Sequence, residues 1–412
     1  MPFSIPYLSS LSLDIRQYLL ITANYWVFTL SDGALRMLVI LHFHHLGYSP
    51  LEIAFLFLFY ELFGVITNLL GGWLGAKIGL NKTMNIGLGL QIIALSMLLV
   101  PPAWLTIPWV MAAQALSGVA KDLNKMSAKS AIKLLVADDA QHTLYRWVAL
   151  LTGSKNALKG TGFFIGGILL VAIGFTSTIA SMAILLGLLW VVSLITLKHD
   201  LGKASNKPKF TQIFSKNSAI NFLSAARCFL FAARDVWFVV ALPVYFSTQL
   251  NWSHWQVSSF LALWIIGYGL VQTLAPILSS RQSNTAPKSK SASTWAFPLA
   301  IIPLSMAFFL GTSANTTLVL VIGLLGFGVL FAINSSLHSY LILSLAERKN
   351  VSLDVGFYYM ANALGRLLGT VLSGYLYQAY GLSACLIVSS VFIFIAAILS
   401  LFIDTASTKT ST

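Results

Sequence analysis

The sequence predicts an all-α integral membrane protein in which twelve transmembrane helices form two related six-helix bundles. The first observation is composition: 57% of the 412 residues are hydrophobic and only 9% are charged. The second is a series of apolar runs near the length that crosses a ~30 Å hydrocarbon core as a helix. The third is a weak internal duplication. Because lipid offers no hydrogen bonds to a backbone, such runs are expected to be helices.

The apolar runs set the positions of the helices. They cover residues 17–44, 50–76, 82–101, 106–128, 145–173, 178–197, 219–246, 255–279, 295–311, 316–345, 355–379 and 383–403. The N-terminus lacks the basic stretch, apolar core and cleavage site of a secretory signal, so we expect the first helix to be retained.

Lysine and arginine are distributed unequally between the connections. If the N-terminus is inside, none of the six outer connections contains either residue, whereas the inner connections are rich in both. This is the positive-inside pattern, and it predicts cytoplasmic termini in a bacterial inner (plasma) membrane. The pattern also explains much of the net charge of +13, so we do not expect nucleic acid as a partner.

The duplication relates the two halves of the chain. LGYSPLEIA at 46–54 resembles LNWSHWQVS at 250–258, and the tripeptide NAL occurs at both 156–158 and 362–364. The polar connection between these halves predicts three parts: an N-terminal bundle at 1–197, a cytoplasmic loop at 198–218 and a C-terminal bundle at 219–412. Two such repeats make the major facilitator fold, whose substrate site lies near the membrane midplane between the halves.

The connection after the second helix, GGWLGAKIGLNKT at 71–83, resembles the signature loop of major facilitators. The matching residues are Gly72, Leu74, Lys77, Gly79 and Lys82. Ala76 stands where that motif has aspartate, which puts the charge-relay gate associated with the aspartate in doubt.

Charged residues within the predicted helices are the candidates for function, because a charge at bilayer depth costs a few kcal/mol. We expect substrate contacts from Arg36, Lys121, Lys155, Lys159, Arg234 and Arg366, together with Asn362, one helical turn before Arg366. Arg227 and Asp122 are the remaining charges at this depth. Asp32, Glu61 and Asp235 are candidates for proton coupling or charge pairing.

Two lysine series carry much of this charge. Lys121, Lys125, Lys129 and Lys133 recur every fourth residue. We expect Lys121 to face a cavity and the last two to anchor the cytoplasmic end, while Lys125 could do either because its long side chain can snorkel. Lys155 and Lys159 share one helix face and are too deep to reach water easily, so we expect both to line a water-filled pathway.

The acids leave alternatives open. Asp32 and Arg36 have the spacing of an ion pair within one helix; alternatively, Arg36 contacts substrate while Asp32 positions it or takes up a proton. Asp235 follows Arg234 directly and is not expected to face it. Asp32 and Glu61 are the candidate carriers for proton-driven antiport, and passive transport along the substrate's own gradient is the alternative.

An excess of interior cations predicts a small, multiply charged anion as substrate, because guanidinium and ammonium groups suit phosphate and carboxylate oxygens. An importer or exchanger of an ordinary organophosphate or dicarboxylate would use the same cations. A membrane sensor or enzyme is the alternative from another class, but no nucleophile–base pattern supports an enzyme. The two cysteines, Cys228 and Cys385, exclude a thiolate metal cluster. We expect no metal and no cofactor.

Several stretches resemble the ArsJ family of organoarsenical efflux permeases. They are residues 24–50, 56–85, 115–135, 151–160 (LTGSKNALKG) and 232–245 (AARDVWFVVALPVY). The resemblance implies export of 1-arseno-3-phosphoglycerate, an ester made from arsenate by cytosolic glyceraldehyde-3-phosphate dehydrogenase, and therefore arsenate resistance. That dehydrogenase is then a functional partner, beside the small anionic substrate and the lipid bilayer. We expect a monomer.

The orientation can be tested directly. Because the outer connections lack Lys and Arg, a reporter fused after Thr412 should give a cytoplasmic signal, and one inserted between Ser49 and Pro50 an external signal. An external signal after Thr412 would contradict the twelve-helix arrangement.

Overall fold

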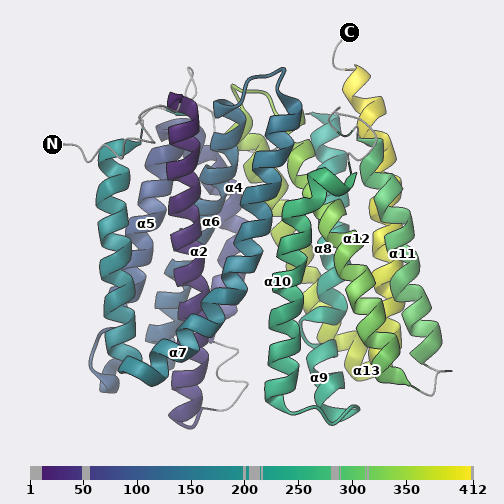
Figure 1. Cartoon of the computed structure of the whole chain (residues 1–412), viewed down its shortest axis with the longest axis horizontal. Helices are drawn as coiled ribbons and strands as arrows, with labels where there is room; N and C mark the ends of the chain where they lie inside the picture. Colours follow the sequence, from purple (N-terminus) through teal and green to yellow (C-terminus); the bar gives the residue numbers. More distant parts are fainter. Residues whose placement is uncertain are drawn as a thin grey trace. The chain divides into compact units, whose positions relative to one another are not determined.

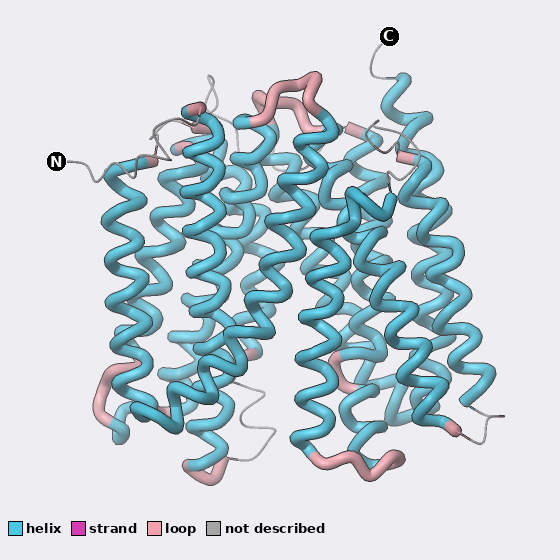
Figure 2. Tube along the Cα trace, in the orientation of Figure 1, coloured by secondary structure: helices cyan, strands magenta, loops and turns pink. Residues whose placement is uncertain are grey.

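The structure is a computed structural model that describes residues 12–48, 56–197, 201–203, 214, 217–279, 287, 289–310, 312 and 315–409. These residues are almost wholly helical, and no strand occurs among them (Figure 2). An all-helical chain with this mean hydropathy, +0.82, satisfies its backbone hydrogen bonds within each segment, as a bilayer requires.

Most helices are long enough to cross a membrane (Figure 1). They are α2 (Leu13–His45), α4 (Leu58–Ile78), α5 (Leu80–Met97), α6 (Ile107–Leu135), α7 (Gln141–Thr196), α8 (Ser218–Phe238), α9 (Ala241–Thr248), α10 (His254–Ser279), α11 (Lys290–Leu310), α12 (Thr316–Leu345) and α13 (Val351–Lys409), with a short 3-10 turn, η1, at Pro102–Trp104.

The two longest helices each contain two spans. α7 turns at Gly174 (φ 79°, ψ 172°) and α13 at Gly381 (φ 78°, ψ −174°), left-handed conformations that favour glycine. These turns fall within the predicted connections between 173 and 178 and between 379 and 383. Most of the described part of every predicted span therefore lies in helix; residues 98–101 of the third span do not, and residues 50–55 of the second span lie outside the described residues.

By length and composition alone, eight helices in the described residues are able to span a membrane, and α5 and α6 are not among them. α6 differs because it carries the series of lysines from Lys121 to Lys133. Its polar residues are buried in the protein, so α6 does not have the apolar composition by which a membrane span is recognised.

The predicted span at 219–246 is interrupted. α8 ends at Phe238 and α9 begins at Ala241. Pro243 explains the break, since its ring would clash with the carbonyl group four residues earlier, on Val239. The N–H of Ala241 donates to Ser373 Oγ at 3.1 Å, which satisfies one of the backbone groups released by the break.

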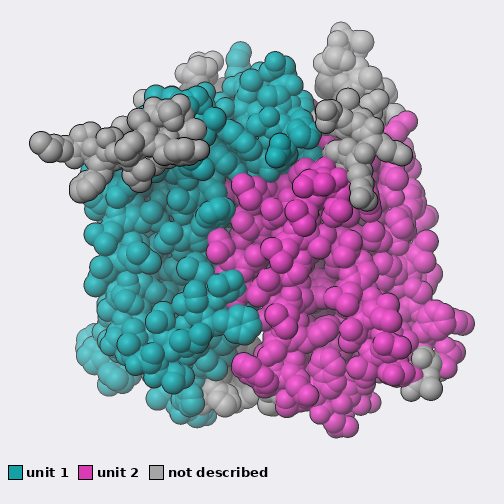
Figure 3. Space-filling model, viewed as in Figure 1, with its two compact units in different colours: residues 1–147, 161–213, 347–356 teal, residues 148–160, 214–346, 357–412 magenta. Residues whose placement is uncertain are grey.

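The chain packs into two compact units, which are described separately (Figure 3). Unit 1 contains residues 1–147, 161–213 and 347–356. Unit 2 contains residues 148–160, 214–346 and 357–412. Unit 1 therefore includes residues 347–356 from the C-terminal half of the chain, and unit 2 includes residues 148–160 from the N-terminal half. The division into 1–197, 198–218 and 219–412 stays a prediction.

In unit 1, α4 and α5 pack against α6, and glycines allow the closest approaches. A Cβ on Gly72 would lie 2.6 Å from the Ser352 carbonyl oxygen and 2.9 Å from Gly356 Cα. Ser352 Oγ in turn donates to the Gly72 carbonyl at 2.6 Å. Segment 347–356 is therefore held against α4 by backbone contact, the kind of packing that small residues provide in membranes.

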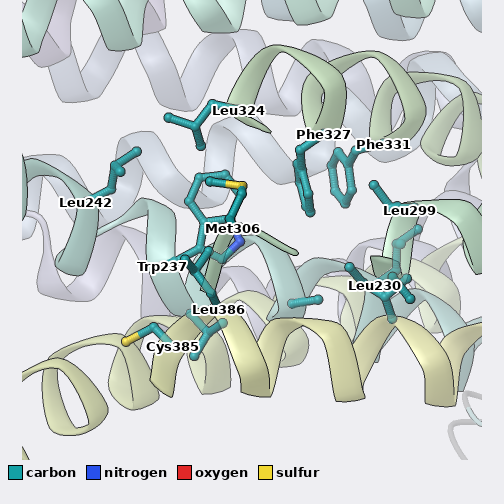
Figure 4. Packing of buried hydrophobic residues seen from close by; sticks show 14 of the residues in the cluster. Leu230, Trp237, Leu242, Leu299, Met306, Leu324, Phe327, Phe331, Cys385 and Leu386 are labelled. Carbon is teal, nitrogen blue, oxygen red and sulfur yellow. The ribbon is translucent and has the colours of Figure 1, made fainter. Parts of the chain in front are cut away.

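In unit 2, α10 and α11 pack against α12, and an aromatic core fills the space between helices (Figure 4). Trp237 meets Phe327 edge to face at 4.9 Å and donates from Nε1 to Ser389 Oγ at 3.2 Å. Phe327 stacks on Phe331 at 5.4 Å. This core supports the part of α8 that carries Arg234 and Asp235.

The glycine packing can be tested with a matched pair of substitutions. Gly72→Ala should lower stability by about 1–3 kcal/mol, because its methyl group has no room. Gly187→Ala should be neutral or stabilise by up to about 1 kcal/mol, because nothing lies within 4 Å of the added atom. Thermal unfolding of the detergent-solubilised protein would measure both. Equal melting temperatures for the two variants would contradict the close contact.

Candidate functional site

The first charge cluster lies in unit 1, where two charged residues of α2, Asp32 and Arg36, bind side chains of α4. Arg36 Nη2 forms an ion pair with Glu61 Oε1 at 3.0 Å. Asp32, which is 5% exposed, accepts a hydrogen bond from the Tyr60 hydroxyl at 2.6 Å. These two charges on α2 therefore have neighbours on α4, as well as the helical spacing that the sequence suggested.

Tyr60 connects this cluster to α6. The centre of its buried ring lies 4.8 Å from the Arg36 guanidinium carbon and 3.8 Å from Lys121 Nζ. Two cations therefore lie against the same aromatic ring. Such contacts stabilise a cation where water is scarce. The structure thus brings Arg36, Lys121, Asp32 and Glu61 around a residue that sequence reasoning missed, since tyrosine in an apolar run carries no special signal.

The α6 lysines are more buried than expected. Lys125 pairs with Asp122 at 2.6 Å. Lys129 and Lys133 are 4% and 6% exposed, and Lys133 lies 3.7 Å from Asp138. Both lysines are therefore buried within the protein, and their anchoring of the cytoplasmic end stays a prediction. Long aliphatic stems allow such burial when the ammonium group finds a partner.

Arg348 holds the end of α6. It donates to both carboxylate oxygens of Asp138, at 2.9 and 3.0 Å, and to the carbonyl groups of Leu134 and Val136. The guanidinium group beside the exposed Asp138 lowers the pKa of that carboxyl group. A cation at a helix C-terminus satisfies carbonyl groups that have no partner within the helix. Sequence reasoning gave Arg348 no such role.

The second charge cluster lies in unit 2 and centres on Asp235, which is 1% exposed. Its Oδ1 lies 2.6 Å from Arg234 Nη2, and its Oδ2 lies 3.3 Å from Arg366 Nε. The expectation that Asp235 does not face Arg234 is wrong. Helix spacing fixes the directions of the Cβ atoms, whereas the long arginine side chain folds back to reach its neighbour.

Aromatic rings complete the second cluster. The Arg234 guanidinium carbon lies 4.8 Å from the Phe231 ring and 5.6 Å from the Phe331 ring, which belongs to the aromatic core described above. Arg366 is the more accessible arginine, with a side chain 36% exposed against 17% for Arg234. Arg366 is therefore the arginine of this cluster that a solute reaches more easily.

Asn362 belongs to a separate polar chain in unit 2. It accepts from Arg227 Nε at 2.9 Å, and Arg227 Nη1 donates to Ser335 Oγ at 3.1 Å. Gln272 Nε2 also donates to Ser335 Oγ, and Asn156 Nδ2 donates to Gln272 Oε1 at 2.7 Å. Arg227, 3% exposed, was not among the predicted substrate contacts, yet it is the cation that holds Asn362.

Lys155 and Lys159 lie on the stretch of α7 that belongs to unit 2, and both side chains are half-buried. The same stretch packs closely against α10: a Cβ on Gly153 would meet the Gly269 carbonyl oxygen at 2.5 Å. Their predicted role in lining a substrate pathway stays a prediction.

Long apolar helices that bury charged side chains are typical of a polytopic membrane protein. The family model described as Major Facilitator Superfamily matches residues 21–346, so the chain belongs to the Major Facilitator Superfamily. The protein is a transporter of a small molecule and not an enzyme. The predicted fold class is confirmed.

Solved structures show the same fold at low sequence identity. The human organic anion transporter MFSD10 (TETRAN) is 13% identical with a TM-score of 0.73, over 95% of this chain and 100% of that one. A bacterial homologue of the iron transporter ferroportin is 15% identical with a TM-score of 0.73, over 95% and 100%. The E. coli fucose:proton symporter FucP is 12% identical with a TM-score of 0.71, over 95% and 99%. No curated protein sequence matches.

The Asp235 cluster makes a stability prediction. Asp235→Asn should destabilise the protein by about 3 kcal/mol, because two arginines lose their charged partner. Arg366→Gln should cost much less, because Arg366 is partly exposed and Asp235 keeps Arg234. Thermal unfolding of the two purified variants measures the difference. If Arg366→Gln were as damaging as Asp235→Asn, Asp235 would not be the centre of the cluster.

Proposed function

We propose that this transporter exports a small, multiply charged organic anion, with 1-arseno-3-phosphoglycerate as the substrate and arsenate resistance as the result. In the first cluster, Arg36 and Lys121 both lie against Tyr60. The observation that carries the anion class is the second cluster, in which the single carboxylate of Asp235 serves two arginines. An anion entering such a site supplies the negative charge that the protein itself provides sparingly.

Arg36 illustrates how the exchange of partners would occur. Its Nη2 binds Glu61, while its Nε is buried without a hydrogen-bond partner in the described residues. A buried donor that lacks an acceptor is unfavourable, so a phosphate or carboxylate oxygen at this position would be stabilised. Guanidinium geometry also favours two parallel hydrogen bonds to one oxyanion.

Comparisons alone do not select the substrate, because proteins of this fold carry different solutes. One similar structure is named as an organic anion transporter, another as a fucose:proton symporter and a third as a homologue of an iron transporter. The anion class therefore rests on the side chains. The first of these names is consistent with that class.

The arsenic-specific part of the proposal rests on the resemblance to ArsJ permeases. In that pathway, glyceraldehyde-3-phosphate dehydrogenase makes the ester in the cytosol, and the ester breaks down outside. The substrate's own gradient therefore runs outward across the bacterial inner membrane. We propose that one chain, with both termini in the cytoplasm, forms the transport pathway.

The Arg36–Glu61 contact bears on how anion transport could be coupled to proton binding. An ionised Glu61 competes with the substrate for Arg36, whereas a protonated Glu61 releases Arg36. Electrostatics therefore makes proton and anion binding favour each other. Proton antiport would instead require that proton binding and anion binding compete with each other. We propose that any antiport exchanges the substrate for another anion.

Transport in vesicles would test the function. Inverted membrane vesicles supplied with glyceraldehyde-3-phosphate, NAD+, arsenate and the dehydrogenase should accumulate arsenic, and omission of the dehydrogenase should abolish accumulation. Transport of phosphoglycerate without arsenate would instead identify an ordinary organophosphate carrier. If no anion is transported by correctly inserted protein, the anion proposal is wrong.

The same assay would test the residues. We propose that Lys159, Arg366 and Arg36 each contact the substrate. Replacing one of them by alanine should cost roughly 1.5–3 kcal/mol, or about a 10- to 150-fold loss of apparent affinity. The control is the exposed Lys290→Ala, since Lys133 is buried beside Asp138. Wild-type affinity in well-inserted Lys159→Ala and Arg366→Ala variants would assign these charges to structure alone.

The Arg36–Glu61 pair predicts a gain of affinity in one variant. Glu61→Gln should bind the anion more tightly than the wild type, because the neutral amide no longer competes with the substrate for Arg36. Asp14→Asn, at the exposed start of α2, is the control. Apparent affinity in the vesicle assay gives the result, and an unchanged affinity in Glu61→Gln would remove Glu61 from this role.

A further inference from the structure

A groove on unit 1 is separate from both charge clusters. Its volume is about 860 Å³, and it lies between the end of α4, one face of α5 and the last turns of α7. Three lysines, Lys77, Lys82 and Lys203, line it, and no acidic residue is among its described lining residues. The remaining wall is mostly apolar.

The three lysines converge because of local backbone structure. Lys77 is in the last turn of α4, and its ammonium group lies 4.5 Å from the Trp73 ring centre. Lys82 is in the first turn of α5. The Leu80 N–H donates to the Leu201 carbonyl at 2.8 Å, which holds the segment with Lys203 beside the start of α5. The polar end of the groove is therefore built from three elements.

The apolar part follows one face of α5. Lys82, Ile86, Gly89 and Ile93 are spaced four, three and four residues apart, so they form a stripe along the helix. From Lys82 to Ile93 this stripe rises ~16 Å, about half the ~30 Å thickness of a hydrocarbon core. The groove therefore has the length of one leaflet.

Gly89 and Trp190 form the middle of the groove wall. The nearest side-chain atom to a Cβ at this position would belong to Trp190, at 3.5 Å, an ordinary contact distance. The Trp190 indole is fixed because its Nε1 donates to the Asn85 carbonyl at 2.9 Å. A flat indole wall beside a glycine leaves room for a hydrocarbon chain.

We propose that this groove binds an anionic phospholipid, with its phosphate at the three lysines and one acyl chain along Ile86, Gly89 and Ile93. The charge of the lysines selects an anionic headgroup, and the depth of the groove fits one leaflet. By the predicted orientation this is the cytoplasmic leaflet. The site is independent of the transported substrate, because none of its lysines belongs to either charge cluster.

Native mass spectrometry of the purified full-length protein tests the proposal. The protein is mixed with equal amounts of dioleoyl phosphatidylglycerol and dioleoyl phosphatidylcholine, which share the same acyl chains. The wild type should retain the anionic lipid at least tenfold more. Each Lys→Gln substitution should weaken that preference about fivefold, and K77Q/K82Q/K203Q should remove it.

Two further variants separate headgroup from acyl chain. Gly89→Leu should reduce retention of both lipids, because the added side chain occupies the apolar groove while its Cβ is accommodated. K290Q/K349Q, which removes two exposed lysines outside the groove, should keep the wild-type preference. Inorganic phosphate at the lipid concentration should not displace the lipid, since it lacks the chain.

Equal retention of the two lipids by the wild type would overturn the proposal, as would an undiminished preference in K77Q/K82Q/K203Q. Displacement by inorganic phosphate alone would overturn it as well, because it would identify a site for the free anion.

Discussion

A charge placed in the hydrocarbon core of a membrane needs a partner, and this constraint organises the interior of the protein. Moving an unpaired ion from water into such a medium costs several kcal/mol even after relaxation. Both charge clusters therefore join carboxylates to cations, whereas the buried Arg227 is held by the neutral oxygens of Asn362 and Ser335. Asp235 binds two arginines, and Glu61 binds Arg36 across two helices. The helices that carry these residues must pack closely enough to keep them in contact.

Packing and charge are consequently linked. The aromatic core around Trp237 and Phe327 fixes α8 beside α12, and Phe331 from that core also faces Arg234. In unit 1, Tyr60 combines both functions, because its hydroxyl binds Asp32 while its ring faces two cations. One tyrosine thus links α2, α4 and α6 through a hydrogen bond and two cation–π contacts.

The sequence predicted the helical segments well because apolar length and positive-inside charge are properties of single segments. Pro243 could have revealed the break between α8 and α9, since a proline disturbs the carbonyl group four residues before it. The ion pairs between different helices were harder to predict. Arg36 meets Glu61, and Arg366 meets Asp235, only because separate helices pack side by side. No single-helix pattern contains that information, and the Arg234–Asp235 contact depends on a flexible side chain.

The central claim is that the interior cations bind a multiply charged organic anion, and ligand-induced stabilisation of the purified transporter tests it most directly. Melting temperature would be measured against increasing 3-phosphoglycerate, with glycerol and choline as neutral and cationic controls. A ligand that binds the folded state stabilises it in proportion to the logarithm of its concentration above Kd. The account predicts that the melting temperature rises with the logarithm of the 3-phosphoglycerate concentration and stays unchanged with glycerol and choline. No rise with this anion, or an equal rise with choline, would contradict it.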